Sequence, residues 1–283
     1  QTARTAMQRE LIETLGTIGA THVRFLFGLP FSLLFLAAIA IAAPEPLPAP
    51  NATARAWICS GALSQVAATA LMLAAMRERS FIVTTALAKV EPVWVAFASA
   101  AFLHEPLTAS MMITIAIATA GVLLMSWPRA SHGGHAPSLQ SALLGLGAGA
   151  LFGFAAIGYR GGIGALGGTS FLTAATVALA IALAFQTAVL SSYLAVRDRD
   201  TLVAIAKAWR PSLFAGFMGA LASQFWFLAF ALQSAALVRT VALIEILFAL
   251  FVSRRIFDQR LGSREALGIL LLVAGVAALL NTV

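Results

Sequence analysis

The sequence has 283 residues, of which 60% are hydrophobic and only 10% charged, with a formal net charge of +7. Soluble domains carry about 25% charged residues, so this composition excludes a water-soluble globular fold. The basic residues stand singly or in twos between apolar runs. This dispersal argues against a nucleic-acid partner and is typical of membrane-topology signals.

Apolar runs of about twenty residues recur along the chain, which is the length that an α-helix needs to cross about 30 Å of hydrocarbon. Strands of a membrane barrel would instead alternate over about ten residues. Because lipid satisfies no backbone hydrogen bond, the predicted fold class is all-α and integral to the membrane. Nine complete spans are expected, at 22–43, 55–76, 80–103, 108–127, 139–160, 169–194, 211–232, 235–253 and 264–281.

Two polar segments organise these spans. Gln1 to Gly16 is too polar to cross a bilayer and has no hydrophobic signal-peptide region, so we interpret it as the end of a truncated first helix. The stretch WPRASHGGHAP lies midway and predicts a first repeat at 1–130, a linker at about 128–137 and a second repeat at 138–283. Its His132 and His135 have no further ligands nearby in sequence, so no metal site is expected there.

An internal repeat with an offset of 154 positions supports this division. The segment from Ser80 (SFIVTTALAKVEPVWVAF) then aligns without a gap to the segment from Ser234 (SAALVRTVALIEILFALF), and Glu91 falls on Glu245. Two copies of a five-span unit enter the membrane in opposite senses, an inverted repeat typical of secondary transporters. The same offset predicts ten helices in the natural protein, arranged as two five-helix bundles.

Basic residues are distributed unevenly between the loops. Only Arg55, Arg160 and Arg239 are assigned to the side that follows even-numbered helices. The opposite side holds thirteen, namely Arg4, Arg9, Arg77, Arg79, Arg129, Arg197, Arg199, Lys207, Arg210, Arg254, Arg255, Arg260 and Arg264. The positive-inside rule therefore predicts that the thirteen are cytoplasmic and that Val283 is outside.

Lys89, Glu91 and Glu245 lie near the middle of their predicted spans. Each charge costs about 2.5–3.5 kcal/mol at mid-bilayer on insertion scales, so we expect all three to face the protein interior. Lys89 and Glu91 point about 200° apart on a helix and cannot pair, which makes Glu245 the natural partner of Lys89. Pro92 removes a backbone hydrogen bond and predicts a kink or gate beside Glu91.

Two interpretations of these charges stay open: they line a substrate or proton path, or they form a buried ion pair that fixes helix register. Other polar and aromatic residues inside spans either contact such a path or pack against helices and lipid, namely Ser64, Gln65, Ser223, Gln224, Trp94 and Trp226. Gly145, Gly149 and Gly153 recur every four residues and predict close helix packing.

The duplication is accompanied by Arg24 at the start of a span, by EPVWVAF at Glu91 to Phe97, and by HEPLT at His104 to Thr108. In these features the chain resembles the drug/metabolite transporter superfamily, specifically its EamA-type ten-helix exporters. The resemblance implies two five-helix repeats around a central cavity, working by alternating access. It also implies export of amino acids, including aromatic ones, or of toxic organic compounds, often against protons.

We therefore expect a secondary exporter of small amphipathic metabolites, multi-pass in the cell (inner) membrane, whose partners are a small-molecule substrate, the lipid bilayer and protons. The alternative within the superfamily is a flippase for lipids or lipid-linked sugars, which needs a lateral opening lined by basic residues. A membrane-embedded enzyme is disfavoured because no span holds an Asp or a mid-span histidine. No catalytic residue, cofactor or metal is accordingly expected, and the sequence does not indicate an oligomeric state.

Overall fold

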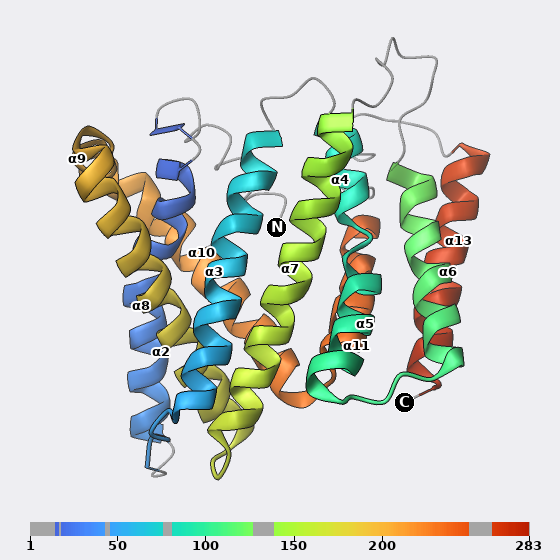
Figure 1. Cartoon of the computed structure of the whole chain (residues 1–283), viewed down its shortest axis with the longest axis horizontal. Helices are drawn as coiled ribbons and strands as arrows, with labels where there is room; N and C mark the ends of the chain where they lie inside the picture. Colours follow the sequence, from blue (N-terminus) through green and yellow to red (C-terminus); the bar gives the residue numbers. More distant parts are fainter. Residues whose placement is uncertain are drawn as a thin grey trace. The chain divides into compact units, whose positions relative to one another are not determined.

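The computed structural model describes residues 15–16, 18–42, 46–75, 81–126, 139–248 and 262–282, and the regular structure in these ranges is helical (Figure 1). Its elements are α2 (Leu29–Ala42), α3 (Ala52–Ala75), α4 (Phe81–Ala88), α5 (Glu91–Leu103), α6 (Ala109–Ser126), α7 (Leu139–Leu166), α8 (Phe171–Arg197), α9 (Arg199–Lys207), α10 (Trp209–Leu232), α11 (Ala235–Val241), η2 (Ala242–Ile244) and α13 (Ser263–Leu280).

Eight helices within these ranges are long and apolar enough to cross a membrane: Ile18–Ala42, Ala52–Ala74, Thr85–Leu103, Ala109–Ser126, Ala142–Leu166, Phe171–Arg197, Ser212–Leu232 and Ser263–Leu280. They correspond to eight of the nine expected spans. The prediction of an all-α, multi-pass membrane protein is thus confirmed. The ninth span, 235–253, is described only as far as residue 248. The linker at 128–137 and residues 1–14 lie outside the described residues.

One expected loop is a helix. The sequence between the spans ending at 194 and beginning at 211 contains α9, which we had interpreted only as a charged connection. Asp198 caps this helix, because its carboxylate accepts hydrogen bonds from the backbone N–H and the hydroxyl of Thr201, at 3.1 and 2.7 Å. The inward side chain of Ile205 is 1% exposed. Capping and one-sided burial stabilise a segment whose charge suggested a loop.

The chain forms two compact units, each built from segments of both sequence halves. Unit 1 comprises residues 1–73 and 155–233, and unit 2 comprises residues 74–154 and 234–283. Neither unit therefore coincides with one of the two sequence repeats that meet near residue 130.

In unit 1, α8 packs along the helix Ile18–Ala42 and along α10. Val23, near the start of the first of these helices, shares a buried cluster with Leu194, near the end of α8. The two helices therefore run in opposite directions. Shifting residue 18 by 154 positions gives 172, at the beginning of α8, so the sequence offset relates this antiparallel pair.

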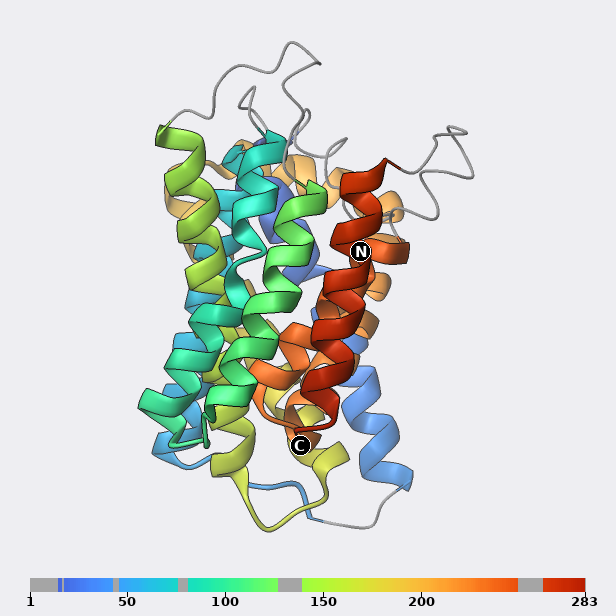
Figure 2. The same ribbon diagram turned by 90° about the vertical axis from the view of Figure 1, so that its right-hand side faces the viewer.

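In unit 2, α6 and α13 pack side by side (Figure 2). The bounds of α6, 109 and 126, shifted by 154 positions, are those of α13, 263 and 280. Gly275 lies against Ala118, and Gly121 lies against Leu272. Shifting Ala118 and Gly121 by 154 positions gives Leu272 and Gly275, so the offset converts one contact into the other. This is expected of an antiparallel pair around a local two-fold axis.

Candidate functional site

The candidate site begins where Pro92 interrupts a membrane helix. α4 ends at Ala88, and α5 begins at Glu91, with Lys89 and Val90 in a turn between them. The backbone N–H groups of Lys89 and Val90 bond three residues back, to Ala86 and Leu87, at 3.0 and 3.1 Å. A proline excludes the regular helical bond at its own nitrogen and crowds the carbonyl four residues earlier. This geometry places Glu91 in the first turn of α5.

A second interruption occupies the corresponding place in the other sequence half. α11 ends at Val241 and is followed by the 3-10 segment Ala242–Ile244, directly before Glu245. Lys89 and Val90, shifted by 154 positions, fall on Leu243 and Ile244. The two acidic residues related by the offset thus each follow a break in a helix. Such breaks free backbone groups and position side chains at the depth of the break.

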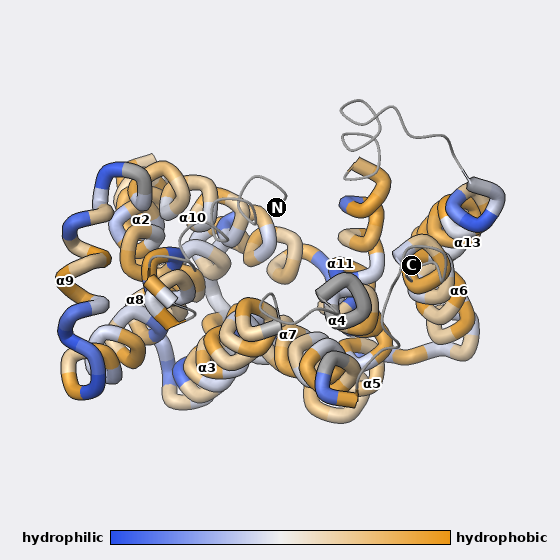
Figure 3. Tube along the Cα trace, turned by 90° about the horizontal axis from the view of Figure 1, so that it is seen from above, coloured by the Kyte–Doolittle hydropathy of each residue, from blue (hydrophilic) through white to orange (hydrophobic). Residues whose placement is uncertain are grey.

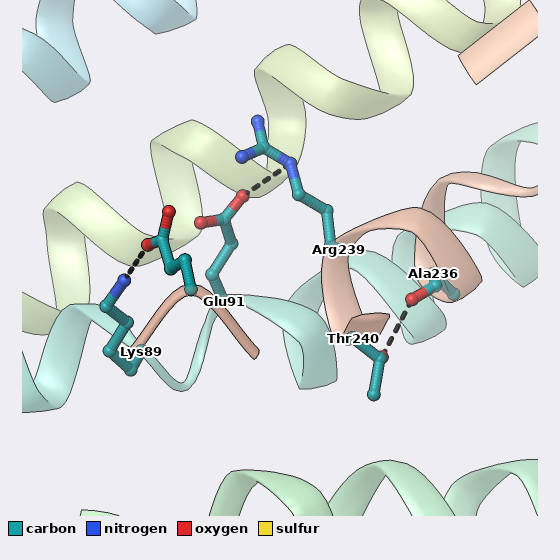
Figure 4. Close-up of polar contacts among 6 residues, drawn as sticks. Lys89, Glu91, Ala236, Arg239 and Thr240 are labelled. Atoms are coloured by element: carbon teal, nitrogen blue, oxygen red, sulfur yellow. Dashed lines mark hydrogen bonds and ion pairs between the residues drawn. The ribbon is translucent and has the colours of Figure 1, made fainter. Parts of the chain in front are cut away.

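Two ion pairs join these breaks within unit 2 (Figure 4). Lys89 Nζ lies 2.5 Å from Glu245 Oε1, and Arg239 Nε lies 2.9 Å from Glu91 Oε1. Each acid is therefore neutralised by a base from the other half, and the four formal charges cancel. The expected pairing of Lys89 with Glu245 is confirmed. The side chains of this pair are 27% and 33% exposed, whereas those of Arg239 and Glu91 are 15% and 16% exposed.

Arg239 and Arg160 correct the sequence interpretation, which counted both as charges at helix ends. Arg239 belongs to the cluster of ion pairs just described. Arg160 lies within α7, which continues to Leu166, and its Nη1 donates to the carbonyl oxygens of Phe230 and Ala231 at 2.7 and 3.3 Å. These carbonyls close the C-terminal end of α10, where a cation is favourable. Of the three, Arg55 alone lies at a helix end, in the first turn of α3, which begins at Ala52.

Unit 1 holds a separate, neutral polar cluster that includes Gln65. Tyr159 donates its hydroxyl to Gln65 Oε1 at 2.5 Å, and Gln186 Nε2 donates to the same oxygen at 2.9 Å. Gln186 Nε2 also lies 3.1 Å from the carbonyl oxygen of Ala62. Gln186 is 1% exposed, and its Oε1 has no partner in the described structure. Neither Tyr159 nor Gln186 was predicted from the sequence.

The remaining polar and aromatic candidates occupy different surroundings. Gln224 is buried and donates to Thr176 Oγ1 at 2.7 Å. The ring of Trp226 lies 5.8 Å from that of Phe230, and Trp94 is 46% exposed on its unit. Ser64 and Ser223 are half-buried. Unit 1 thus brings Gln65 into a hydrogen-bonded cluster, whereas the structure joins neither serine to it by a described contact.

The glycine stripe lies against the broken helix in unit 2. A Cβ at Gly149 would meet the carbonyl oxygen of Ala88 at 2.9 Å, and one at Gly153 would meet Val95 at 3.2 Å. Gly145 is also buried. These approaches place α7 directly beside the end of α4 and the start of α5. No group of three or more metal-ligating side chains occurs among the described residues.

Comparisons with known proteins agree with this architecture. Residues 3–127 match the EamA-like transporter family. A crystal structure of another protein superposes with a TM-score of 0.66 and 13% sequence identity, over 97% of this chain and 90% of the other, which shows a shared fold. No curated protein matches the sequence. The resemblance to EamA-type members of the drug/metabolite transporter superfamily that the sequence indicated is therefore supported by a family match over residues 3–127.

Proposed function

We propose that this transporter is a secondary exporter of small amphipathic solutes, with amino acids as the best-matched class, and that it works by alternating access in the cell's inner membrane. The observation that carries the proposal is the reciprocal ion pairing at two broken helices. Broken helices with charged side chains at mid-membrane depth are the usual construction of substrate sites in secondary transporters. A purely structural ion pair would not require two interrupted helices.

The more accessible pair supports a zwitterionic solute. Lys89 and Glu245 present one cation and one anion at adjacent positions, and both side chains are partly exposed. An α-amino acid carries an ammonium and a carboxylate group at similarly short separation. Exchanging the protein's ion pair for two pairs with the solute, carboxylate to Lys89 and ammonium to Glu245, leaves the net charge of the site at zero. No uncompensated charge then enters the low-dielectric interior.

The less accessible pair supports a fixed role for Glu91 and Arg239. Their side chains are about half as exposed as those of Lys89 and Glu245. In this proposal Glu91 and Arg239 hold the two helix breaks together while Lys89 and Glu245 exchange their ion pair for contacts with the solute. The antiparallel α6–α13 pair, with its exchanged Ala118 and Gly275 contacts, supports the inverted repeat that alternating access needs.

The decisive measurement is efflux of labelled amino acids from loaded proteoliposomes, with and without a pH gradient. We expect zwitterionic amino acids to leave faster than their amine-only and acid-only analogues of the same side chain, and an inward proton gradient to accelerate export. Scrambling of labelled phospholipid without amino-acid flux would reject the proposal and favour the flippase. Equal flux of all three analogues would reject the zwitterion mechanism alone.

Gln65 supplies a second prediction, for the neutral polar cluster of unit 1. Two donors hold its Oε1, and its Nε2 has no hydrogen-bond partner in the described structure, so this amide is oriented to donate to a passing carbonyl or carboxylate oxygen. We expect Gln65→Glu to lower the efflux of carboxylate-bearing solutes by about tenfold, since an acceptor and negative charge replace a donor. The efflux of amine-only analogues should fall less than twofold.

Tyr159→Phe is the matched control for Gln65→Glu. It removes one of the two donors to Gln65 Oε1 and keeps the ring packing against Phe227, whose centroid lies 4.4 Å away. Its effect on carboxylate-bearing solutes should be smaller and should show as a higher KM with nearly unchanged maximal efflux. If Gln65→Glu lowers the flux of every analogue equally, the residue has only a structural role.

A further inference from the structure

The short helix α9 has one side buried in unit 1. Its Ile205 packs in a cluster with Val23 and Leu194, and Leu202 and Ala204 lie against the same cluster. The Thr201 hydroxyl beside Asp198 holds the pKa of that carboxyl below its ordinary value, so the cap is charged at neutral pH. The helix is therefore fixed on the unit, and its opposite side faces outward.

The outward side is basic and apolar at its C-terminal end. Lys207 ends α9, and Trp209 and Arg210 begin α10. These three residues, which we call the α9 corner, are all exposed, and the Arg210 guanidinium lies 5.4 Å from the Trp209 ring centroid. Figure 3 shows hydrophilic residues at the ends of α9 around an apolar middle. Asp198 and Asp200 lie at the other end of α9, about 13 and 10 Å from Lys207 along the helix axis at 1.5 Å per residue. Lys207 and Arg210 form no described ion pair.

The neighbouring spans lead us to expect the α9 corner at the bilayer surface. α8 ends its span at Arg197, and the next span begins at Ser212, so the corner occupies the connection at one end of both. Val203, on the outer side of α9, is 52% exposed, and Trp209 is 47% exposed. Exposed tryptophan and aliphatic side chains beside cations are suited to the boundary between headgroups and acyl chains.

We propose that the α9 corner binds the headgroups of anionic phospholipids. The phosphate oxygens accept from Lys207 and Arg210, while the Trp209 ring and Val203 lie among the upper acyl carbons. The partner follows from charge complementarity, since two cations that form no ion pair among the described residues attract anionic lipid over zwitterionic lipid at a bilayer surface. This surface is distinct from the broken helices of unit 2, and it does not depend on what the protein transports.

The experiment uses tryptophan quenching by brominated lipids in reconstituted vesicles. The fluorescence of Trp209 is obtained as the difference between the wild type and Trp209→Phe, because the chain has five tryptophans. We expect brominated phosphatidylglycerol to quench this signal in preference to brominated phosphatidylcholine. The preference should fall by about five-fold for each cation removed, as in Lys207→Gln and Lys207→Gln with Arg210→Gln, and should weaken at high salt.

Arg55→Gln is the matched control, because it removes an exposed cation at the start of α3 and should leave the quenching preference unchanged. Unfolding temperatures in detergent show whether the double variant still folds. Equal quenching by the two lipids, or an unchanged preference in a folded double variant, would overturn the proposal. Loss of the preference on adding inorganic phosphate at constant ionic strength would reassign the site to free phosphate.

Discussion

Glu245→Gln is expected to reduce amino-acid efflux by about a hundredfold. The substitution removes the anion that faces Lys89 and leaves that cation without its partner at a break in a membrane helix. An unpaired charge in a low-dielectric setting is costly, and because this pair is partly exposed we expect a loss of roughly 1–3 kcal/mol in stability. The larger effect is on flux, since the proposed ammonium contact is lost. Both quantities are measured on the same preparation, by unfolding in detergent and by efflux from proteoliposomes.

The charge-exchanged double variant, Lys89→Glu with Glu245→Lys, separates the structural from the functional interpretation. It restores an ion pair between the same two positions but reverses the polarity offered to a zwitterion. We expect stability to return to near the wild-type value while efflux remains at least tenfold low. Recovery of both would show that the pair only fixes helix packing. Asp200→Asn, which makes the same change of charge at an exposed position of α9, should change neither quantity.

Much of the fold follows from the length and composition of the apolar runs, because lipid permits few other solutions for such a chain. The charged residues Lys89, Glu91 and Glu245 could be selected from sequence for the same reason: mid-span charges must be paired. Arg239 was missed because it lies near the beginning of its run, where a linear count cannot distinguish a helix end from a buried position. How deeply Arg239 is buried depends on how its helix packs against the others, and the sequence alone does not give this packing.

The neutral cluster and α9 show a different limit. Gln186 lies deep in an apolar run and offered the same signal as Gln65, but an uncharged amide inside a helix does not reveal which other helix completes its hydrogen bonds. Only the packing of α3, α7 and α8 identifies Tyr159 as the third member. α9 was missed because a nine-residue helix contains too few turns for its apolar side to stand out among charges.

Gly275→Ala is expected to destabilise unit 2 by roughly 3 kcal/mol. A Cβ at this position would lie 2.6 Å from the backbone nitrogen of Ala118 and 2.9 Å from its Cα. Backbone atoms cannot rotate away as a side chain does, so α6 and α13 must separate and lose contacts along their length. Gly121→Ala should act similarly, because its Cβ would lie 2.6 Å from the carbonyl oxygen of Gly268.

The matched control is Gly164→Ala in α7, where an added Cβ meets no atom within 4 Å. There the higher helix propensity of alanine should leave the protein unchanged or more stable by about 1 kcal/mol. Once α6 and α13 have separated in the Gly275→Ala variant, adding Gly121→Ala should lower the stability by less than it does alone. The reason is that both substitutions disturb the same helix crossing. The stability of the three single variants and of the double variant is measured by thermal unfolding in detergent. Additive losses, or a Gly275→Ala protein as stable as the wild type, would contradict the close antiparallel contact and the two-fold relation that the proposed transport cycle needs.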